Sequence, residues 1–248
     1  MSLSYKTIID VGAHNGDDVD YYLKKRFKVI ALEANPVLCN LMRERFVDYI
    51  KGGVLSIHNV AISNYTGQTK FYINREKTDW SSLHKASKAT ETEYDVHEVN
   101  VVTLRSIMEG VDNVHYIKLD IEGGELDALK SIDSSCKLPR FISIECNYDR
   151  TEIIDVLIGS GYTEFMLVRQ GKDYLSRPKP PAMEGSFCDY EFTSNHSGMF
   201  GMELEGEWLS ASEFLDYKKA EFIEWDSSGH VGSNPYGPGW YDIHARLF

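Results

Sequence analysis

The stretch IIDVGAHNG, residues 8–16, decides the fold class that this sequence predicts. A short apolar run ends at Asp10 and Val11, and a turn with two glycines follows. Gly12 lets the backbone turn sharply and approach a ligand closely, and Gly16 relieves crowding where a helix begins. The stretch therefore predicts a β-strand, a glycine turn and a helix whose first free N–H groups face an anionic group of a ligand. The alternative is a plain strand-to-helix corner that binds nothing.

Outward from this stretch, strand-like and helix-like segments alternate along the chain. The predicted strands are residues 7–11, 28–32, 54–60, 69–73, 96–102, 114–119, 141–146, 162–168 and 241–246, and the predicted helices are residues 17–27, 36–46, 103–108, 125–132, 152–159 and 211–222. Such alternation is typical of a doubly wound, Rossmann-like α/β fold, in which a mostly parallel sheet has helices on both faces. We expect residues 1–170 to form the core. Residues 171–248 are expected to be an extension of the same domain that completes the sheet and shapes a substrate pocket.

Polar side chains end five of the predicted strands. These residues are Asp10, Glu33, Asn59, Asp120 and Glu145. Ligands of open α/β sheets bind outside the carboxyl ends of the strands, so these side chains are the first candidates for a binding site. The alternative is that strand ends are polar because they meet loops, which explains one or two such residues more easily than five.

Two of these acids indicate the kind of cofactor. Glu33 follows the glycine turn by about 20 residues, where an acid commonly binds both hydroxyls of a ribose. Asp10 ends the first strand, where it would repel the pyrophosphate of a dinucleotide. It suits the cationic methionine end of S-adenosylmethionine, which carries an ammonium and a sulfonium and no phosphate. The electrostatics therefore favour S-adenosylmethionine over NAD.

Composition and charge exclude several classes of protein. The chain has 248 residues, is 42% hydrophobic and has a formal net charge of −12. This is enough apolar material for a core, and the acidic balance disfavours nucleic acid or an anionic membrane as the main partner. No C-x-x-C pair and no apolar run near the ~20 residues of a membrane span occur. We expect a cytoplasmic protein that acts on a small or uncharged molecule.

Four motifs together resemble a known family. They are Asp10-Val-Gly-Ala-His-Asn-Gly16, Ala31-Leu-Glu-Ala-Asn-Pro36, Asn59-Val-Ala-Ile-Ser63 and Ile117-Lys-Leu-Asp-Ile-Glu-Gly-Gly-Glu125. In this order and spacing they are similar to the FkbM-type methyltransferases, over about residues 7–147. The resemblance implies a class I methyltransferase fold with a seven-stranded sheet that binds S-adenosylmethionine. It also implies methylation of hydroxyl oxygens on sugars, polyketides or similar metabolites.

The resemblance assigns roles in cofactor binding. Asp10, Gly12 and Gly16 would line the methionine end, Glu33 would hold the ribose with Asn35 beside it, Asn59 and Ala61 would border the adenine, and Ser82 of the Ser81-Ser82 pair would reach the cofactor carboxylate. His14 and Asn15, in the glycine turn, are also expected to contact the cofactor. The sequence departs from the family at His14, where Asn is frequent, and at the extended spacing between Glu122 and Glu125.

Methyl transfer to an alcohol also needs a group that receives the hydroxyl proton. Asp120 and Glu122 are two residues apart and face the same side of an extended strand end, and His196 lies in a polar, glycine-bearing loop. We predict these three as catalytic residues, with Glu145 as a further candidate base. The competing interpretations are that Glu122 stabilises a helix dipole and that His196 is a solvated loop residue. The Asp120–Glu122 pair is also suited to hold the acceptor or a divalent metal, but no residue spacing predicts a metal site.

The sequence therefore predicts an enzyme, an S-adenosylmethionine-dependent O-methyltransferase that acts on a small metabolite or glycan. Two alternatives remain: an NAD(P)-dependent oxidoreductase of Rossmann type, and a cofactor-binding module without catalysis. The first would need a hydride-site signature such as Tyr-x-x-x-Lys, and the second would be favoured by loss of Asp10 or Glu33. Trp80 is expected either to cap the sulfonium by cation–π attraction or to anchor a lid.

Overall fold

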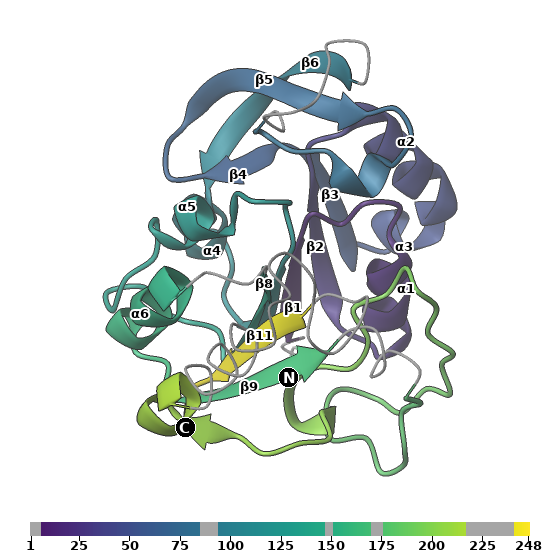
Figure 1. Ribbon diagram of the computed structural model, residues 1–248. Coiled ribbons are helices and arrows are strands. Elements are labelled where there is room, and N and C mark those ends of the chain that lie inside the picture. The colour runs from purple at the N-terminus through teal and green to yellow at the C-terminus, as the bar shows by residue number, and fades with distance from the viewer. Residues whose placement is uncertain (1–5, 85–93, 147–150, 170–175, 217–240) are drawn as a thin grey trace.

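An eight-stranded sheet forms the centre of the computed structural model, which describes residues 6–84, 94–146, 151–169, 176–216 and 241–248 (Figure 1). Its strand order is β10-β9-β11-β8-β7-β1-β2-β3. The bounds are β1 Thr7–Val11, β2 Lys28–Glu33, β3 Leu55–Asn59, β7 Val114–Leu119, β8 Phe141–Cys146, β9 Glu164–Arg169, β10 Leu209–Ser210 and β11 Tyr241–Arg246. The five neighbouring strands β3, β2, β1, β7 and β8 are mutually parallel, and β11 lies antiparallel between β8 and β9.

The α/β class I methyltransferase fold predicted from the sequence is confirmed, but the expected number of seven strands is wrong. The eighth strand is β10, whose two residues pair with Phe165 and Glu164 at the edge of the sheet. Two residues are too few to show the alternation of polar and apolar side chains that marks a strand in a sequence. The boundary predicted at residue 170 stays a prediction.

Helices cover both faces of this sheet (Figure 1). They are α1 Asp17–Lys24, α2 Pro36–Arg45, α3 Val47–Lys51, α4 Leu104–Glu109, α5 Glu125–Leu129 and α6 Thr151–Ser160. Successive side chains of β1 point to opposite faces. Ile8 joins the apolar core beneath α1, whereas Ile9 and Val11 join the core that α5 and α6 contribute to. Asp10 therefore lies on the α1 face, together with Ile8.

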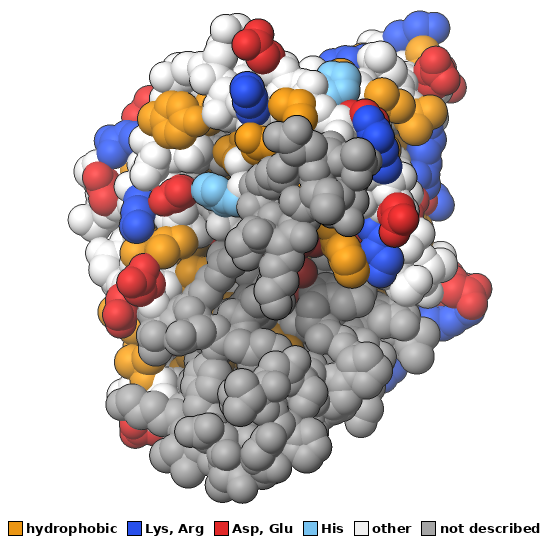
Figure 2. Space-filling model, turned by 45° about the horizontal axis from the view of Figure 1, so that its top comes forward, with side chains coloured by type: hydrophobic (Ala, Val, Ile, Leu, Met, Phe, Trp, Pro, Cys, Tyr) orange, Lys and Arg blue, Asp and Glu red, His pale blue; other side chains and the backbone are white. Residues whose placement is uncertain are grey.

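A smaller sheet lies at the top of the view in Figure 1. It consists of β4 Ala61–Ser63, β5 Gly67–Asn74 and β6 Tyr94–Thr103, in the order β4-β6-β5. The predicted strands at 69–73 and 96–102 are its two long members. The strand predicted at 54–60 is β3 of the large sheet, and β4 of the small sheet begins two residues after β3 ends. Charged side chains of both signs lie on the face that this sheet presents in Figure 2.

The described part of the C-terminal region packs against α1. Phe200 stacks on Tyr116 of β7 with ring centroids 4.4 Å apart, and Phe192 lies edge-on against Tyr21 at 4.8 Å. Residues 211–216 are helical, as predicted, and the rest of the expected helix at 211–222 lies outside the described residues. None of the helices in the described ranges has the length and apolar character that crossing a bilayer requires. This packing brings residues 194–197 to the carboxyl ends of the central strands.

Candidate active site

A cavity of about 620 Å³ opens at the carboxyl ends of β1, β2, β7 and β8. The small sheet and the C-terminal region complete its walls. The predicted site residues that line it are Gly12, His14, Asn15, Glu33, Ala61, Asp120, Glu122, Glu145 and His196. The other predicted residues, Asp10, Gly16, Asn35, Asn59 and Ser82, lie behind this lining. The structure thus divides the predicted set into residues that face the cavity and residues that support them.

The two glycines of the turn at residues 12–16 allow close contacts between parts of the protein. Gly12 has a φ of +82°, and a Cβ there would overlap the carbonyl oxygen of Asp120, so its absence lets the ends of β1 and β7 meet. Gly16 also has a φ of +82°, and a Cβ there would lie 2.7 Å from the ring of Phe46. The expected relief of crowding at Gly16 is what the structure shows. At Gly12 the backbone closely approaches the end of β7 and also lines the cavity.

Glu33 is a buried carboxylate held by two backbone amides. The N–H of Asn35 donates to its Oε1 at 2.7 Å, and the N–H of His14 donates to its Oε2 at 2.8 Å. Burial raises the pKa of Glu33 to about 7, although these amides oppose the rise. Each oxygen keeps a lone pair for a further donor, so the carboxylate is arranged to accept hydrogen bonds from two neighbouring hydroxyls.

Two asparagines predicted to touch the cofactor hold the turn that carries Glu33, and their contact with the cofactor stays a prediction. The Asn35 side chain accepts the N–H of Val37 at 2.9 Å and caps α2. The Asn59 amide donates to the carbonyls of Glu33 and Ala34 at 2.9 and 2.8 Å. Both side chains therefore hold the turn after β2 from behind the cavity.

The other residues near the glycine turn are also engaged with the protein. Asn15 exchanges two hydrogen bonds with Asp17, and the His14 ring contacts the hydroxyl of Thr78 at 2.9 Å. The Ser82 hydroxyl donates to the carbonyl of Glu122 at 2.7 Å, which ties the loop after β5 to the end of β7. Burial lowers the pKa of His14. His14 thus joins the turn to the loop that carries Trp80.

Trp80 lines the cavity and is 53% exposed. The ammonium of Lys77 lies 3.8 Å from the centroid of its ring. A cation from this chain is therefore already stacked on the ring, so capping of a cofactor sulfonium by Trp80 stays a prediction.

Lys118 was missed by the sequence analysis. It lies in β7 directly beside Asp10, and its Nζ is 3.0 Å from Asp120, 3.6 Å from Asp18 and 3.9 Å from Asp10. Both carboxylate oxygens of Asp10 are fully buried and accept no hydrogen bond. Burial raises the pKa of Asp10 to about 7, and the Lys118 ammonium opposes that rise. The signal available in the sequence was a lysine between the apolar residues Ile117 and Leu119 of a buried strand.

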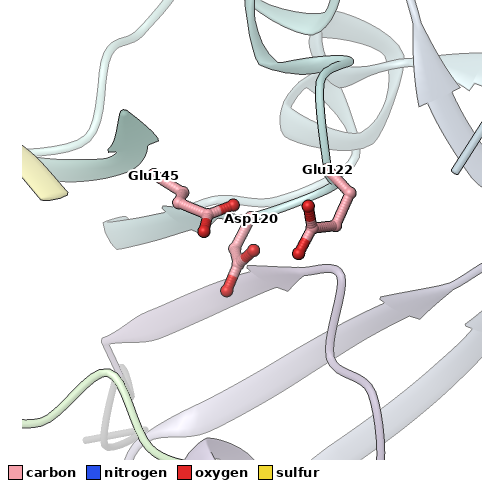
Figure 3. Close-up of side chains that lie close together, drawn as sticks. All are labelled: Asp120, Glu122 and Glu145. Carbon is pink, nitrogen blue, oxygen red and sulfur yellow. The ribbon is translucent and has the colours of Figure 1, made fainter. Parts of the chain in front are cut away.

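Three carboxylates meet at the carboxyl ends of β7 and β8 (Figure 3). Asp120 and Glu122 come from the end of β7 and Glu145 from the end of β8, with one oxygen of each within 4.8 Å of the others. Burial, followed by the charge of Asp120, raises the pKa of Glu145 to about 11. Carboxylate oxygens in such a group are also the ligands that a hard divalent cation prefers, a possibility that residue spacing did not predict.

His196 lines the cavity but is buried, so the interpretation of a solvated loop histidine is wrong. Its Nδ1 accepts the N–H of Thr193 at 3.0 Å, and its Nε2 is 3.2 Å from the hydroxyl of Tyr190. That hydroxyl donates to Asp20 at 2.8 Å, which leaves its oxygen to accept the Nε2 proton. Both ring nitrogens are therefore engaged within the protein, which favours a structural role over general-base catalysis.

Comparison with known proteins identifies the family. The methyltransferase FkbM domain profile matches residues 10–178 of this chain. The chain belongs to the FkbM methyltransferase family. No curated protein matches the sequence.

Solved structures similar to this FkbM methyltransferase include three methyltransferases. The FkbM methyltransferase of Methylobacillus flagellatus is 18% identical with a TM-score of 0.45, over 66% of this chain and 40% of that one. The precorrin-6y C5,15-methyltransferase of Geobacter metallireducens is 10% identical with a TM-score of 0.39, over 98% and 81% of the two chains. The 1,6-didemethyltoxoflavin-N1-methyltransferase of Burkholderia thailandensis is 11% identical with a TM-score of 0.34, over 66% and 64%.

The cavity of this FkbM methyltransferase fits S-adenosylmethionine, the methyl donor that its family implies. Glu33 presents two oxygens with unused lone pairs, as a ribose diol requires. Asp10 is buried without a hydrogen-bond donor, and among the described residues Lys118 is the lysine or arginine that lies within 4 Å of it and of two further aspartates. A site so short of positive charge suits a cofactor that brings an ammonium and a sulfonium.

Proposed function

We propose that this chain transfers a methyl group from S-adenosylmethionine to a hydroxyl oxygen of a small metabolite or glycan. The observation that carries the proposal is the position of Glu33. Two backbone amides orient its carboxylate in the wall of the cavity. The acidic cluster of Asp120, Glu122 and Glu145 lines the same cavity. Membership of the FkbM family supports methyl transfer in general.

Each group has a distinct task in this reaction. The bound cofactor supplies an electrophilic methyl on a good leaving group, so correct orientation of the acceptor provides most of the acceleration. Glu33 holds the ribose, and the buried charge of Asp10 favours the cationic methionine end. Asp120 accepts the hydroxyl proton while the acceptor oxygen bonds to the methyl carbon and the carbon–sulfur bond breaks. Ser194, Asn195 and Ser197 of the C-terminal region line the cavity and are placed to contact the acceptor.

The structure gives no support to the dinucleotide alternative. A pyrophosphate at the glycine turn would lie close to Asp10 and Asp18, and Lys118 is the one lysine or arginine among the described lining residues that would offset their charge. Like charges in a buried site repel strongly because little water screens them.

Calorimetric titration with S-adenosylhomocysteine tests the proposal. We expect binding by the wild-type chain and a loss of about 100-fold or more in Glu33→Ala, because two hydrogen bonds to a charged group are worth roughly 3–6 kcal/mol together. Glu44→Ala, at an exposed position of α2, is the matched control and should bind like wild type. Tight binding of NAD with no binding of S-adenosylhomocysteine would reject the proposal.

The hydroxyl acceptor needs a separate measurement. Wild-type chain and S-adenosylmethionine are incubated with a panel of sugars and hydroxylated metabolites, and formation of S-adenosylhomocysteine is followed. Turnover with amine or carboxylate acceptors alone would contradict methylation of a hydroxyl oxygen while leaving methyl transfer intact.

A further inference from the structure

The wall of the cavity is strongly acidic. Among the described residues that line it, Lys118 is the one lysine or arginine, whereas the acids number seven: Asp17, Asp18, Glu33, Asp79, Asp120, Glu122 and Glu145. Buried carboxylates that share a site cannot all be ionised, since each charge raises the cost of the next. The position of the single ammonium therefore decides which acids keep their charge.

Lys118 is closest to Asp120. The distance from its Nζ to Asp120 is 3.0 Å, against 3.6 Å to Asp18 on α1 and 3.9 Å to Asp10 on β1. The Lys118 side chain is 5% exposed, so this attraction acts with little screening by water. The pKa of Lys118 is well above its usual value because of these three aspartates, which keeps it cationic. Asp120 is therefore the carboxylate that the ammonium stabilises most.

Glu145 is in the opposite situation. The Lys118 ammonium is ion-paired with Asp120, Asp18 and Asp10, whereas the neighbours of Glu145 in the cluster, Asp120 and Glu122, are both acids. Asp242 of β11 is its partner in the sheet and adds a third negative neighbour. Burial and these charges all favour the neutral acid, and none of the ion pairs seen among the described residues gives Glu145 a cation.

We propose that Lys118 is a positioning residue that decides which acid of the cluster carries a proton. It holds Asp120 as a carboxylate, and the proton stays on Glu145. The protonated Glu145 then donates a hydrogen bond to Asp120. This inference rests on the proposed function only in its consequence, which is that Asp120 rather than Glu145 receives the proton of the acceptor hydroxyl. Lys118 acts through Asp120 and makes no contact with the reacting atoms in this scheme.

Infrared spectroscopy of the full chain at pH 9 tests the proposal without any acceptor. At this pH Asp10 and Glu33, with pKa values of about 7, are ionised, whereas Glu145, with a pKa of about 11, keeps its proton. We expect a carbonyl band of a protonated carboxylic acid that is lost in Glu145→Gln. Persistence of that band in Glu145→Gln, or no such band in the wild type, would overturn the proposal.

Substitution of the lysine supplies the second half of the test. Lys118→Met should increase the protonated-acid band, because burial already raises the pKa of Asp10 and of Asp18 and the ammonium that opposes this rise is lost. Lys118→Arg should keep the wild-type intensity. Lys179→Met is the matched control: it also removes a lysine that is paired with a glutamate, Glu205, but both side chains are exposed and neither lines the cavity. An unchanged band in Lys118→Met with native circular dichroism, or an equal rise in Lys179→Met, would overturn the proposal.

Two further outcomes separate this inference from its competitors. Adding Mg²⁺ should leave the band in place, and its loss would overturn the proposal by showing that Glu145 gives up its proton to a metal. If the band behaves as expected but the wild-type chain fails to bind S-adenosylhomocysteine, the proposed function fails and the division of charge stands.

Discussion

Two buried lysines on the same face of the sheet have very different surroundings. Lys25, which follows α1, is fully buried and lies 2.7 Å from one oxygen of Glu203, whose other oxygen accepts the Tyr21 hydroxyl at 3.1 Å. Lys118 faces three aspartates, and one of them, Asp10, accepts no hydrogen bond. The first arrangement is balanced in charge and holds the C-terminal region to the core. The second has an excess of acid beside a cavity, as expected where a cationic ligand completes the site.

The largest effect is expected when the balanced pair is broken. Lys25→Met leaves Glu203 buried without its cation, and removal of one partner of a buried ion pair costs about 3–5 kcal/mol. Urea denaturation followed by circular dichroism measures the loss. Lys179→Met, which removes an exposed partner of Glu205, is the control and should cost about 1 kcal/mol or less. Equal losses in the two variants would show that Lys25 is not a structural clamp.

A methyl group at Gly12 should disturb the acid-rich cluster while leaving the Lys25 clamp intact. Its Cβ would overlap the Asp120 carbonyl, and the φ of +82° adds strain for any L residue, so Gly12→Ala should lose about 3 kcal/mol or more. Gly53→Ala is the matched control, because its φ is +70° and nothing lies within 4 Å of a Cβ there. That variant should lose only about 1–2 kcal/mol. If Gly53→Ala is as damaging as Gly12→Ala in thermal unfolding, the strand contact is unimportant.

The pH dependence of stability should distinguish the two regions as well. Asp10 has a pKa of about 7 in the folded chain and an ordinary value of 3.8. The folded state therefore binds the extra proton, and this group makes stability fall as pH rises from about 4 to 7, by up to about 1.4 kcal/mol per pH unit. Asp10→Asn should remove that slope in urea titrations, and Asp48→Asn, at an exposed position of α3, should run parallel to wild type. A wild-type slope in Asp10→Asn would contradict the buried, donor-free environment of Asp10.

The sequence predicted what depends on neighbours along the chain. The strand and turn at residues 8–16, the alternation of elements and the acids at strand ends all follow from local periodicity, and the family motifs located Glu33 and Asp120. The two-residue strand β10 has no period to detect. Ion pairs such as Lys118 with Asp10 depend on the register of β1 beside β7, which is set by tertiary packing.

The same limit explains the supporting contacts that the sequence did not predict. Asn35 and Asn59 lie next to the cofactor position in the motifs, yet their amides are used to hold the Glu33 turn. His196 was predicted as a catalytic residue or a solvated residue of a polar loop. The loop folds onto α1 and buries the ring against Tyr190. A motif locates a site along the chain. Whether a side chain faces the cavity or supports it depends on hydrogen-bond partners that are distant in sequence.

The smallest expected effect is a proton released when the cofactor binds to the acid-rich cluster. An ammonium and a sulfonium near Asp10 favour its ionised form, so binding of S-adenosylmethionine near pH 7 should expel a fraction of a proton. Calorimetry in two buffers with different ionisation enthalpies measures that fraction. S-adenosylhomocysteine, which lacks the sulfonium charge, should release less, and Asp10→Asn should abolish the difference between the two ligands. An equal release by both ligands in the wild type would mean that Asp10 does not sense the cofactor charge, and the contrast with the Lys25 clamp would then lie in geometry alone.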